Sequence, residues 1–307
     1  MKKRFIIFHA VPVALFSGIF LGLIAVPGSV KAQGRVSRIV KVTPAGNSAS
    51  AEKAALNAKF GMAATENSRS VSGLSWTFGG RVQNGWEIYE PLIADSIGTS
   101  NDPTTPEFAA AISKWQTIRG LTPTGILDET TLGTFMQYWQ SLRLGRSDFP
   151  GPEKLISAPI TDFYDPTRDA DLLQLERNTY AAYKRMIAAA AKDLSRDVHF
   201  TKNGELAPGE KYLRIVSAFR SQEYQDQLRA KSPGSGRVAL ALHSAHNTGQ
   251  ALDLYVGGDP VSTKDPNRLL QTQTPVYRWL VKNAKRFGFY NYFYEPWHWE
   301  YVPVSKN

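Results

Sequence analysis

Two short stretches near the end of the chain decide its fold and its chemistry. Residues 243–253 read HSAHNTGQALD, and residues 295–301 read EPWHWEY. Both combine histidines with acidic side chains, the residue types that bind zinc through nitrogen and oxygen. The sequence contains no cysteine, which excludes disulfides, thiolate nucleophiles and cysteine-ligated metal sites. A metal site in this protein must therefore be built from His, Asp or Glu.

Three of these side chains form a candidate metal site. His246, Asp253 and His298 would supply two nitrogens and one oxygen and leave a fourth position for water, as catalytic zinc sites do. Gly249 allows the chain to bend back, so that His246 and Asp253 can reach one ion. On these residues alone another interpretation stays open: a core histidine satisfied by a hydrogen bond, and an aspartate that belongs to a turn.

The segments around this site predict a mixed α and β domain. A rigid strand over 252–256 would carry Asp253 near its start. Helices and strands do not alternate strictly, which favours an α+β fold with a central antiparallel sheet and flanking helices over a doubly wound sheet. Helices are expected at 171–195, at 222–229 after a capping Ser221, and at 276–287 before Gly288; strands are expected at 213–219, 252–256, 290–294 and 297–302.

Three blocks of the sequence, taken together, resemble a known family. They are residues 217–221, which read SAFRS, the pattern of Ser244, His246, Gly249, Ala251 and Asp253, and residues 295–301. In this order they look like the zinc D-alanyl-D-alanine carboxypeptidase family typified by VanY. The resemblance implies a small α+β fold, one zinc ion per chain and cleavage of peptidoglycan stem peptides.

The resemblance also implies roles for individual residues. It identifies His246, Asp253 and His298 as the zinc ligands and Glu295 as the catalytic base. It gives Arg220 a role in binding the substrate or stabilising the transition state, for which a bidentate and always charged guanidinium is suited.

Other residues of the same segments leave alternatives open. Glu300 is a rival base, because in a regular strand His298 and Glu300 share a face while Glu295 points away. Pro296 can break that alternation, so we prefer Glu295 and keep Glu300 as a partner of a ligand. Ser244 and Trp297 are expected to line the substrate pocket, and the alternative is that they serve a turn and the core.

A small three-helix domain is expected over residues 76–143. One helix would begin at Pro106 and end at Gly120, and the next would open at Asp128 or Glu129. The pattern from Phe108 onward resembles the second half of a peptidoglycan-binding domain. Residues 144–160 are rich in Pro and Gly and are predicted to be a linker. We expect this domain to serve targeting rather than chemistry.

The first residues have the three parts of a secretory signal. Positions 2–4 read KKR, an apolar stretch runs to about residue 26, and small residues end at position 32. This predicts a signal peptide over 1–32, cleaved before Gln33; an uncleaved membrane anchor is the alternative. Residues 33–75 are predicted to be a flexible tether. The protein would then be exported to the periplasm or the cell wall.

The sequence therefore predicts an exported zinc metallopeptidase with its catalytic domain at 161–307 and peptidoglycan as its partner. It would remove the terminal D-Ala of a stem peptide. One alternative is an endopeptidase that cuts an L-Ala–D-Glu bond, and another is a non-catalytic wall-binding protein. The net charge of +9 includes four basic residues of the leader and does not call for a nucleic-acid partner.

Overall fold

The sheet that carries the candidate site is antiparallel and has four strands. The computed structural model describes residues 45–145, 148–231 and 244–303. In it the strands β5 (Ile215–Ser217), β6 (Ala251–Leu254), β8 (Glu295–Tyr301) and β7 (Phe289–Tyr292) lie in that order across the sheet. Every residue of the inner strand β6 is buried. This arrangement confirms the predicted α+β fold with an antiparallel sheet.

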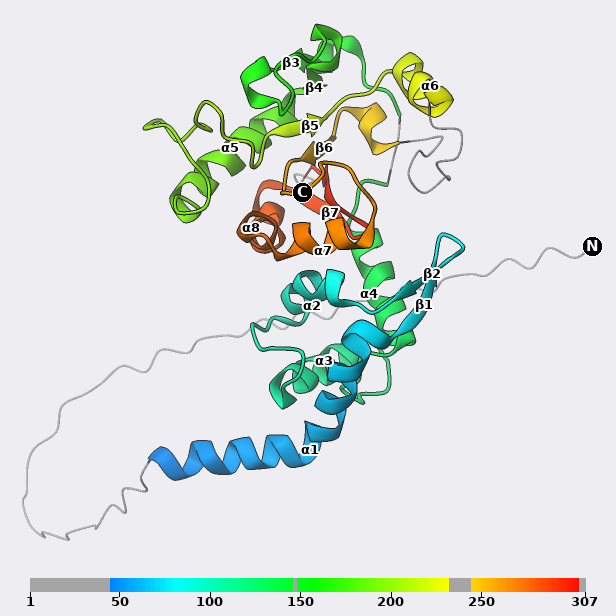
Figure 1. The fold of residues 1–307 in the computed structure, drawn as a ribbon, viewed down its shortest axis with the longest axis vertical. Coiled ribbons are helices and arrows are strands. Elements are labelled where there is room, and N and C mark those ends of the chain that lie inside the picture. The colour runs from blue at the N-terminus through cyan, green and yellow to red at the C-terminus, as the bar shows by residue number, and fades with distance from the viewer. Residues whose placement is uncertain (1–44, 146–147, 232–243, 304–307) are drawn as a thin grey trace, which may run out of the picture. The chain divides into compact units, whose positions relative to one another are not determined.

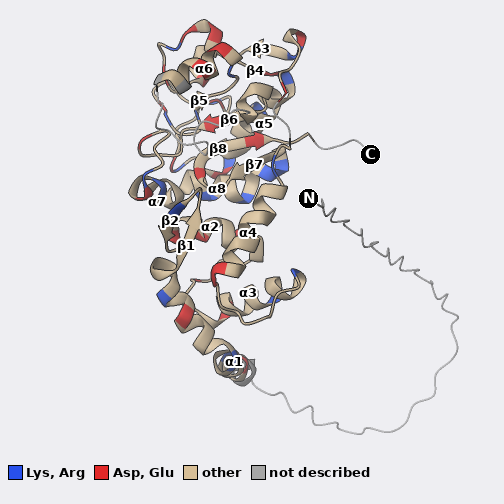
Figure 2. Cartoon of the chain, turned by 90° about the vertical axis from the view of Figure 1, so that its right-hand side faces the viewer, with Lys and Arg blue, Asp and Glu red and all other residues tan. Residues whose placement is uncertain are grey.

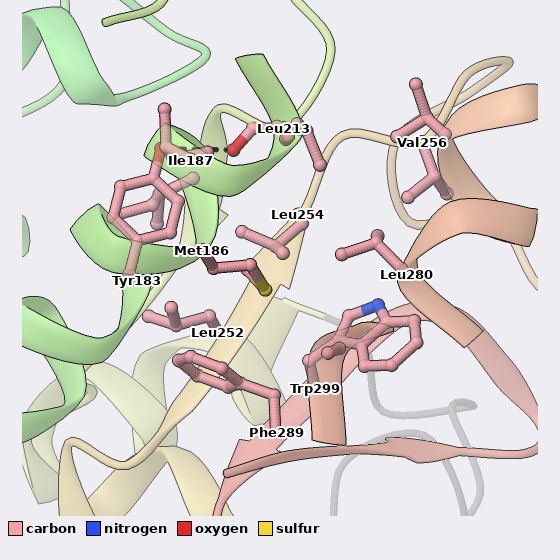
Figure 3. Packing of buried hydrophobic residues seen from close by; sticks show 14 of the residues in the cluster. Tyr183, Met186, Ile187, Leu213, Leu252, Leu254, Val256, Leu280, Phe289 and Trp299 are labelled. Carbon is pink, nitrogen blue, oxygen red and sulfur yellow. Dashed lines mark hydrogen bonds between the residues drawn. The ribbon is translucent and has the colours of Figure 1, made fainter. Parts of the chain in front are cut away.

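Two helices contribute apolar side chains to the core around β6 (Figure 3). Helix α5 (Arg177–Asp193) contributes Tyr183, Met186 and Ile187, and the Tyr183 hydroxyl donates a hydrogen bond of 3.1 Å to the Leu213 carbonyl. Helix α8 (Pro275–Asn283) contributes Leu280. Long apolar side chains at helical spacing thus bury one stripe of each helix, which is the main source of stability for helices of this length.

The expected helix starts and stops are largely the ones observed. The Ser221 hydroxyl accepts a hydrogen bond from the Tyr224 N–H at 3.2 Å and opens helix α6 (Gln222–Lys231). Helix α8 is followed by a 3-10 turn that Gly288 ends with a φ of 89°. Helix α5 begins at Arg177, six residues later than predicted, because residues 174–176 form strand β4 (Gln174–Glu176) against β3 (Leu155–Ser157). Strand β3 lies within the segment predicted to be a linker.

The N-terminal helices enclose a second core that is mostly aromatic. Helices α3 (Pro106–Ile118) and α4 (Glu129–Ser141) begin where predicted, capped by Thr105 and Asp128, and α2 (Glu90–Ile97) precedes them. The sequence did not predict the hairpin of β1 (Ser75–Phe78) and β2 (Arg81–Asn84), nor helix α7 (Asp265–Gln273). This second core, called the aromatic core below, consists of Trp76, Trp86, Tyr89, Ile93, Phe108, Ile112, Trp115, Leu127, Leu132, Phe135, Met136, Trp139 and Phe293.

Two features differ from the expected tether and linker. Helix α1 spans Ala45–Gly73, where the sequence predicted a flexible tether. Alanine is the best helix former, and the second half of α1 buries Phe60 and hydrogen-bonds through Asn67 to the backbone of Leu127 at 2.8 Å. Residues 46–307 form one compact unit, in which α2 contacts α8 (Figure 1). The N-terminal helices are therefore not held apart by a linker.

Charge and length place no described helix in a membrane. Basic and acidic residues are interspersed along the described elements (Figure 2). Within the described ranges, no helix has the length and apolar character needed to span a bilayer. The predicted leader lies outside the described residues.

Gly249 shapes the turn that leads from the site into β6. Its φ of 69° lies in the left-handed region, and its carbonyl accepts a hydrogen bond of 3.0 Å from the Glu176 N–H. A Cβ at this position would come within 2.8 Å of that same nitrogen. The turn therefore requires glycine for both its backbone conformation and its closeness to β4.

We predict that Gly249→Ala lowers the free energy of unfolding by more than about 2 kcal/mol, because strain at positive φ and a backbone clash add together. Gly209→Ala is the matched control, since Gly209 has a φ of 83° and open space around it, and its cost should stay near about 1 kcal/mol. Urea unfolding of both variants measures the difference. Equal costs would show that the contact with β4 is unimportant.

Candidate active site

The structure brings the three predicted ligands together. The His246 Nε2 lies 3.2 Å from both Asp253 Oδ1 and His298 Nδ1, and His298 Nδ1 lies 2.9 Å from Asp253 Oδ1. One ligand atom from each residue lies within 4.8 Å of the other two, and all three residues are buried. Two imidazoles and one carboxylate that converge in this way can hold one zinc ion.

The sheet fixes this geometry through its register. Asp253 on β6 is paired directly with His298 on β8, so their side chains emerge on the same face of the sheet. His246 lies in a short 3-10 turn, residues 245–248, just before β6. The turn at Gly249 then folds this segment back toward the sheet. The sequence spacing of 7 and 45 residues becomes a single cluster.

The outer nitrogen of each histidine ring also has a partner. The His246 Nδ1 lies 2.7 Å from the Ala218 carbonyl oxygen, which accepts its proton. The His298 Nε2 lies 3.1 Å from Glu300 Oε1. Such contacts orient the rings, so that Nε2 of His246 and Nδ1 of His298 face the centre of the cluster, and each nitrogen can offer a lone pair to a metal once it carries no proton. The residues therefore fit a metal in their donor atoms and in the orientation of those atoms.

The cluster is strongly polarised. Burial, with help from the Arg220 charge, lowers the pKa of His246 to about 4, so this ring is neutral. Burial opposes ionisation of Asp253, but His246, His298 and Arg220 outweigh it and hold its pKa well below the usual range. Burial alone would lower the pKa of His298, yet its hydrogen bonds to Asp253 and Glu300 raise that pKa to about 9. A metal ion bound here would displace the His298 proton.

Arg220 lies against the cluster, where β5 ends. Its Nη2 donates to Asp253 Oδ2 at 2.9 Å, and its Nε donates to Ser217 Oγ at 3.1 Å. Its backbone N–H contacts the His246 carbonyl at 3.3 Å. The guanidinium thus positions Asp253, and as a group with five N–H donors it can bind a further acceptor.

A bulge in β8 brings Glu295 toward the same cluster. Asn291 pairs with Trp299, and a regular ladder would pair Tyr292 with His298; instead Tyr292 pairs with Glu295. The Asn291 side-chain amide spans the bulge by donating to the carbonyls of His298 at 2.9 Å and Glu295 at 3.2 Å. The alternation that would point Glu295 away from His298 is therefore broken.

The environment of Glu295 changes its acidity. Burial raises the pKa of Glu295 to about 7. The Asp253 charge raises this pKa further, whereas the charges of His298 and Arg220 lower it. Glu300 differs, because burial is outweighed by its hydrogen bond with His298 and by the Arg143 charge, which lower its pKa to about 2. Glu295 can therefore exchange a proton near neutral pH, whereas Glu300 stays ionised.

Two further predicted residues have simpler surroundings. The Ser244 hydroxyl accepts a hydrogen bond from the His246 N–H at 3.3 Å and caps the 3-10 turn. Trp297 is 3% exposed and belongs to the apolar core. These surroundings favour the turn and core alternatives over a pocket lining. His243 lies outside the described residues.

The site contains contacts that sequence reasoning missed. Asn291 is one, and the pair of Arg143 with Glu300 is another. The sequence pattern around Glu300 suggested a ligand partner, but no local signal connected it with a residue 157 positions earlier.

Comparison with known families finds a match for the part of the chain that carries this site. Residues 172–304 match the family of VanY, described as D-alanyl-D-alanine carboxypeptidase. These residues form a VanY-type domain. The matched range contains all three candidate ligands, Glu295 and Arg220, whereas Arg143 lies before it. This confirms the family that the sequence motifs indicated.

Solved structures with similarity to the chain carry related names. One is the LdcB LD-carboxypeptidase, with 22% identity over 51% of this chain and 71% of that chain, and a TM-score of 0.36. Another is VanYB in complex with D-alanine-D-alanine, with 23% identity over 43% of this chain and 73% of that chain, and a TM-score of 0.28. Among curated proteins, none matches the chain.

The raised pKa of Glu295 predicts a pH-dependent cost to stability in the metal-free protein. Its favourable contribution is fully present below the unfolded pKa of 4.5 and is lost as the pH rises through about 7, because a buried carboxylate must then ionise. Glu295→Gln should therefore raise the free energy of unfolding at pH 8 by about 2–3 kcal/mol and change it little at pH 4. Urea unfolding in a chelator measures this.

The control for that comparison is Glu52→Gln, an exposed substitution on α1 that should leave the pH dependence unchanged. If Glu295→Gln and the unchanged protein lose stability in parallel between pH 4 and pH 8, Glu295 is not the group that titrates.

Proposed function

We propose that the protein is an exported, zinc-dependent peptidase that removes the terminal D-Ala from peptidoglycan stem peptides. Residues 172–304 already match a family described as D-alanyl-D-alanine carboxypeptidase, which supports a peptidase that acts on peptidoglycan. The observation that carries the zinc proposal is the convergence of His246, Asp253 and His298, whose outer atoms are each held by another group. The specificity for D-Ala–D-Ala rests on the family description.

Zinc bound by these three residues would polarise the scissile carbonyl and lower the pKa of a water molecule to about 7. The chain's own residues then handle the protons. Glu295 accepts a proton from the attacking water, whose oxygen forms the new bond to the carbonyl carbon. As the carbon–nitrogen bond breaks, Glu295 gives that proton to the departing amine of D-Ala.

Two observations support Glu295 as the base over Glu300. Glu300 is 0% exposed, and both of its oxygens are engaged: Oε1 by His298 and Arg143, and Oε2 by the Leu144 N–H at 2.9 Å. A carboxylate held in this way, with a pKa of about 2, is a poor proton acceptor. We assign Glu300 the role of orienting His298.

Arg220 is proposed to bind the substrate with the N–H groups that do not contact Ser217 or Asp253. A guanidinium can hold either the carbonyl oxygen that gains charge or the terminal carboxylate of the stem peptide. The leader at 1–32 supports export, and the resemblance of residues 76–143 to a wall-binding domain supports targeting to peptidoglycan. These three assignments remain proposals.

The direct test is to incubate the full-length protein, loaded with zinc, with defined muropeptides and to read the product masses. A stem pentapeptide should lose one D-Ala. Release of an L-Ala-linked fragment instead would favour the endopeptidase alternative, and no cleavage of any muropeptide would favour a wall-binding protein.

Replacing a ligand should release the metal. We predict that His246→Ala and His298→Ala each abolish binding of one zinc per chain and peptidase activity, because each removes one of three ligands. The control is His199→Ala, since the His199 side chain is 88% exposed and its Nδ1 lies 3.1 Å from Glu210 Oε2. Metal analysis after dialysis measures the stoichiometry. Full zinc content in either ligand variant would contradict the site.

Two conservative variants separate the base from the orienting carboxylate. Glu295→Gln should keep zinc and lower turnover by about 10²- to 10⁴-fold, the usual contribution of a positioned general base. Glu300→Gln should instead weaken zinc binding by about 10- to 100-fold and recover much of its activity at high zinc. Zinc affinity and stem-peptide cleavage are measured side by side.

The opposite pattern would overturn these roles. An active Glu295→Gln beside an inactive, zinc-loaded Glu300→Gln would mean that Glu300 is the base. Loss of zinc from Glu295→Gln would make Glu295 a ligand.

A further inference from the structure

The segment that follows helix α4 contacts the VanY-type domain at Glu300, the carboxylate that holds the proposed ligand His298. The Arg143 Nη2 pairs with Glu300 Oε1, and the Leu144 N–H donates to Glu300 Oε2 at 2.9 Å. The centre of the Arg143 guanidinium lies 4.1 Å from the centroid of the Tyr292 ring on β7. Arg143 is thus bound to two strands of a sheet to which it does not belong.

Glu300 depends on these contacts. It is fully buried, and an ionised carboxylate in such a place is strongly destabilised unless a positive charge and hydrogen bonds compensate it. Its partner on the other side is the His298 Nε2 at 3.1 Å. The His298 ring is therefore held by Glu300, and Glu300 is held by Arg143 and Leu144.

Phe293, just before the bulged part of β8, makes a second contact between the VanY-type domain and the N-terminal helices. Phe293, in the loop between β7 and β8, is 1% exposed and belongs to the aromatic core of the N-terminal helices. Its ring centroid lies 5.1 Å from that of Phe78, 5.8 Å from Tyr89 and 6.1 Å from Trp139. Glu295 follows two residues later. The loop that leads to the proposed base is therefore anchored in the aromatic core.

Ion pairs away from the site join the same two parts. Arg278 on α8 lies 3.0 Å from Glu90 on α2, and Lys285 lies 3.0 Å from Asp95. The side chains of Arg278 and Lys285 are about half exposed, so each ion pair alone contributes little to the free energy of unfolding. Substitutions at these two ion pairs disturb the contact between the N-terminal helices and the VanY-type domain without touching the proposed metal ligands.

We propose that the N-terminal helical part is a component of the active site. Arg143 and Leu144 position Glu300, and through it His298, while Phe78, Tyr89 and Trp139 position Glu295 through their contacts with Phe293. This rests on the proposed zinc peptidase function. It differs from the expectation that residues 76–143 serve targeting alone. Arg143, Leu144 and Phe293 are positioning residues, because they act on the site through other side chains.

The first test compares Arg143→Gln with Arg278→Gln in the full-length protein. Arg143→Gln should weaken zinc binding, measured by competition with a chromophoric chelator, by about 10- to 100-fold, as expected when the partner of a ligand is lost. At subsaturating zinc, kcat should fall with zinc occupancy while KM changes little. Arg278→Gln should leave zinc affinity and kcat within about twofold, whatever its effect on Tm.

A double substitution shows whether Arg143 acts through Glu300. In the Glu300→Gln background, Arg143→Gln should weaken zinc binding by less than about threefold further, because residues in one network are not additive. Full additivity would mean that Arg143 acts by another route and would overturn the proposed connection.

The second test concerns the loop. Phe293→Leu keeps an apolar side chain in the aromatic core but loosens its packing, and it should lower kcat by more than about tenfold, because small displacements of a reacting group cost activity. Zinc affinity should stay within about twofold. Phe108→Leu is the matched control, since Phe108 is fully buried in the same core and stacks on Trp86. It should leave kcat unchanged at a similar loss of Tm.

The outcomes separate the two proposals. If the unchanged protein binds zinc and cleaves stem peptides while Arg143→Gln and Phe293→Leu behave like their controls, the N-terminal part is not a component of the site. If the unchanged protein neither binds zinc nor cleaves, the proposed function fails, and this inference fails with it.

Discussion

The buried carboxylate of Asp253 is the constraint on which the rest of the site depends. An ionised group at 2% exposure is tolerated inside a protein only when charges and donors surround it. Here these are His246, His298 and Arg220, which come from three different segments. The register of β6 and β8, the turn at Gly249 and the end of β5 each deliver one of those partners. The position of β6 between β5 and β8 thus places Asp253 between the groups that compensate its charge.

The same requirement continues outward through groups of alternating charge. Arg220 contacts Asp253, Asp253 contacts His298, His298 contacts Glu300, and Glu300 contacts Arg143. Each charge in this row compensates the burial of its neighbours, so removal of one leaves another uncompensated. The row begins at Arg220, just after β5, and ends at Arg143, just after α4. It joins two parts of the chain that sequence patterns separate.

Much of this site was predictable because its parts are short and local. The ligands could be named from motifs in which His246 and Asp253 flank a glycine, and helices α3, α4 and α8 from apolar spacing and capping residues. The bulge at Asn291 was not predictable, since it depends on hydrogen bonds between strands. Helix α1 was not predictable from an apolar stripe, because its sequence combines alanines with small polar residues, a composition that also suits a flexible segment.

The contact of Arg143 with Glu300 shows where sequence reasoning ends. Arginine near the end of a helix usually has a local explanation, in the helix dipole or a surface ion pair. Its actual partner lies 157 residues away and is defined only once the sheet has formed. The linker composition of 144–160 pointed toward separate domains, whereas the buried side chains of Phe293 and Glu300 connect them.

Phe293 gives this connection an order in time. A chain is made from its N-terminus, so the helices that surround the aromatic core are complete long before Phe293 exists. Until Phe293 has been added, that core lacks the ring that Tyr89, Trp139 and Phe78 contact in the finished structure. The N-terminal helices therefore reach their final packing only after β7 has been synthesised, and the closing of their core coincides with the arrival of Glu295 and His298.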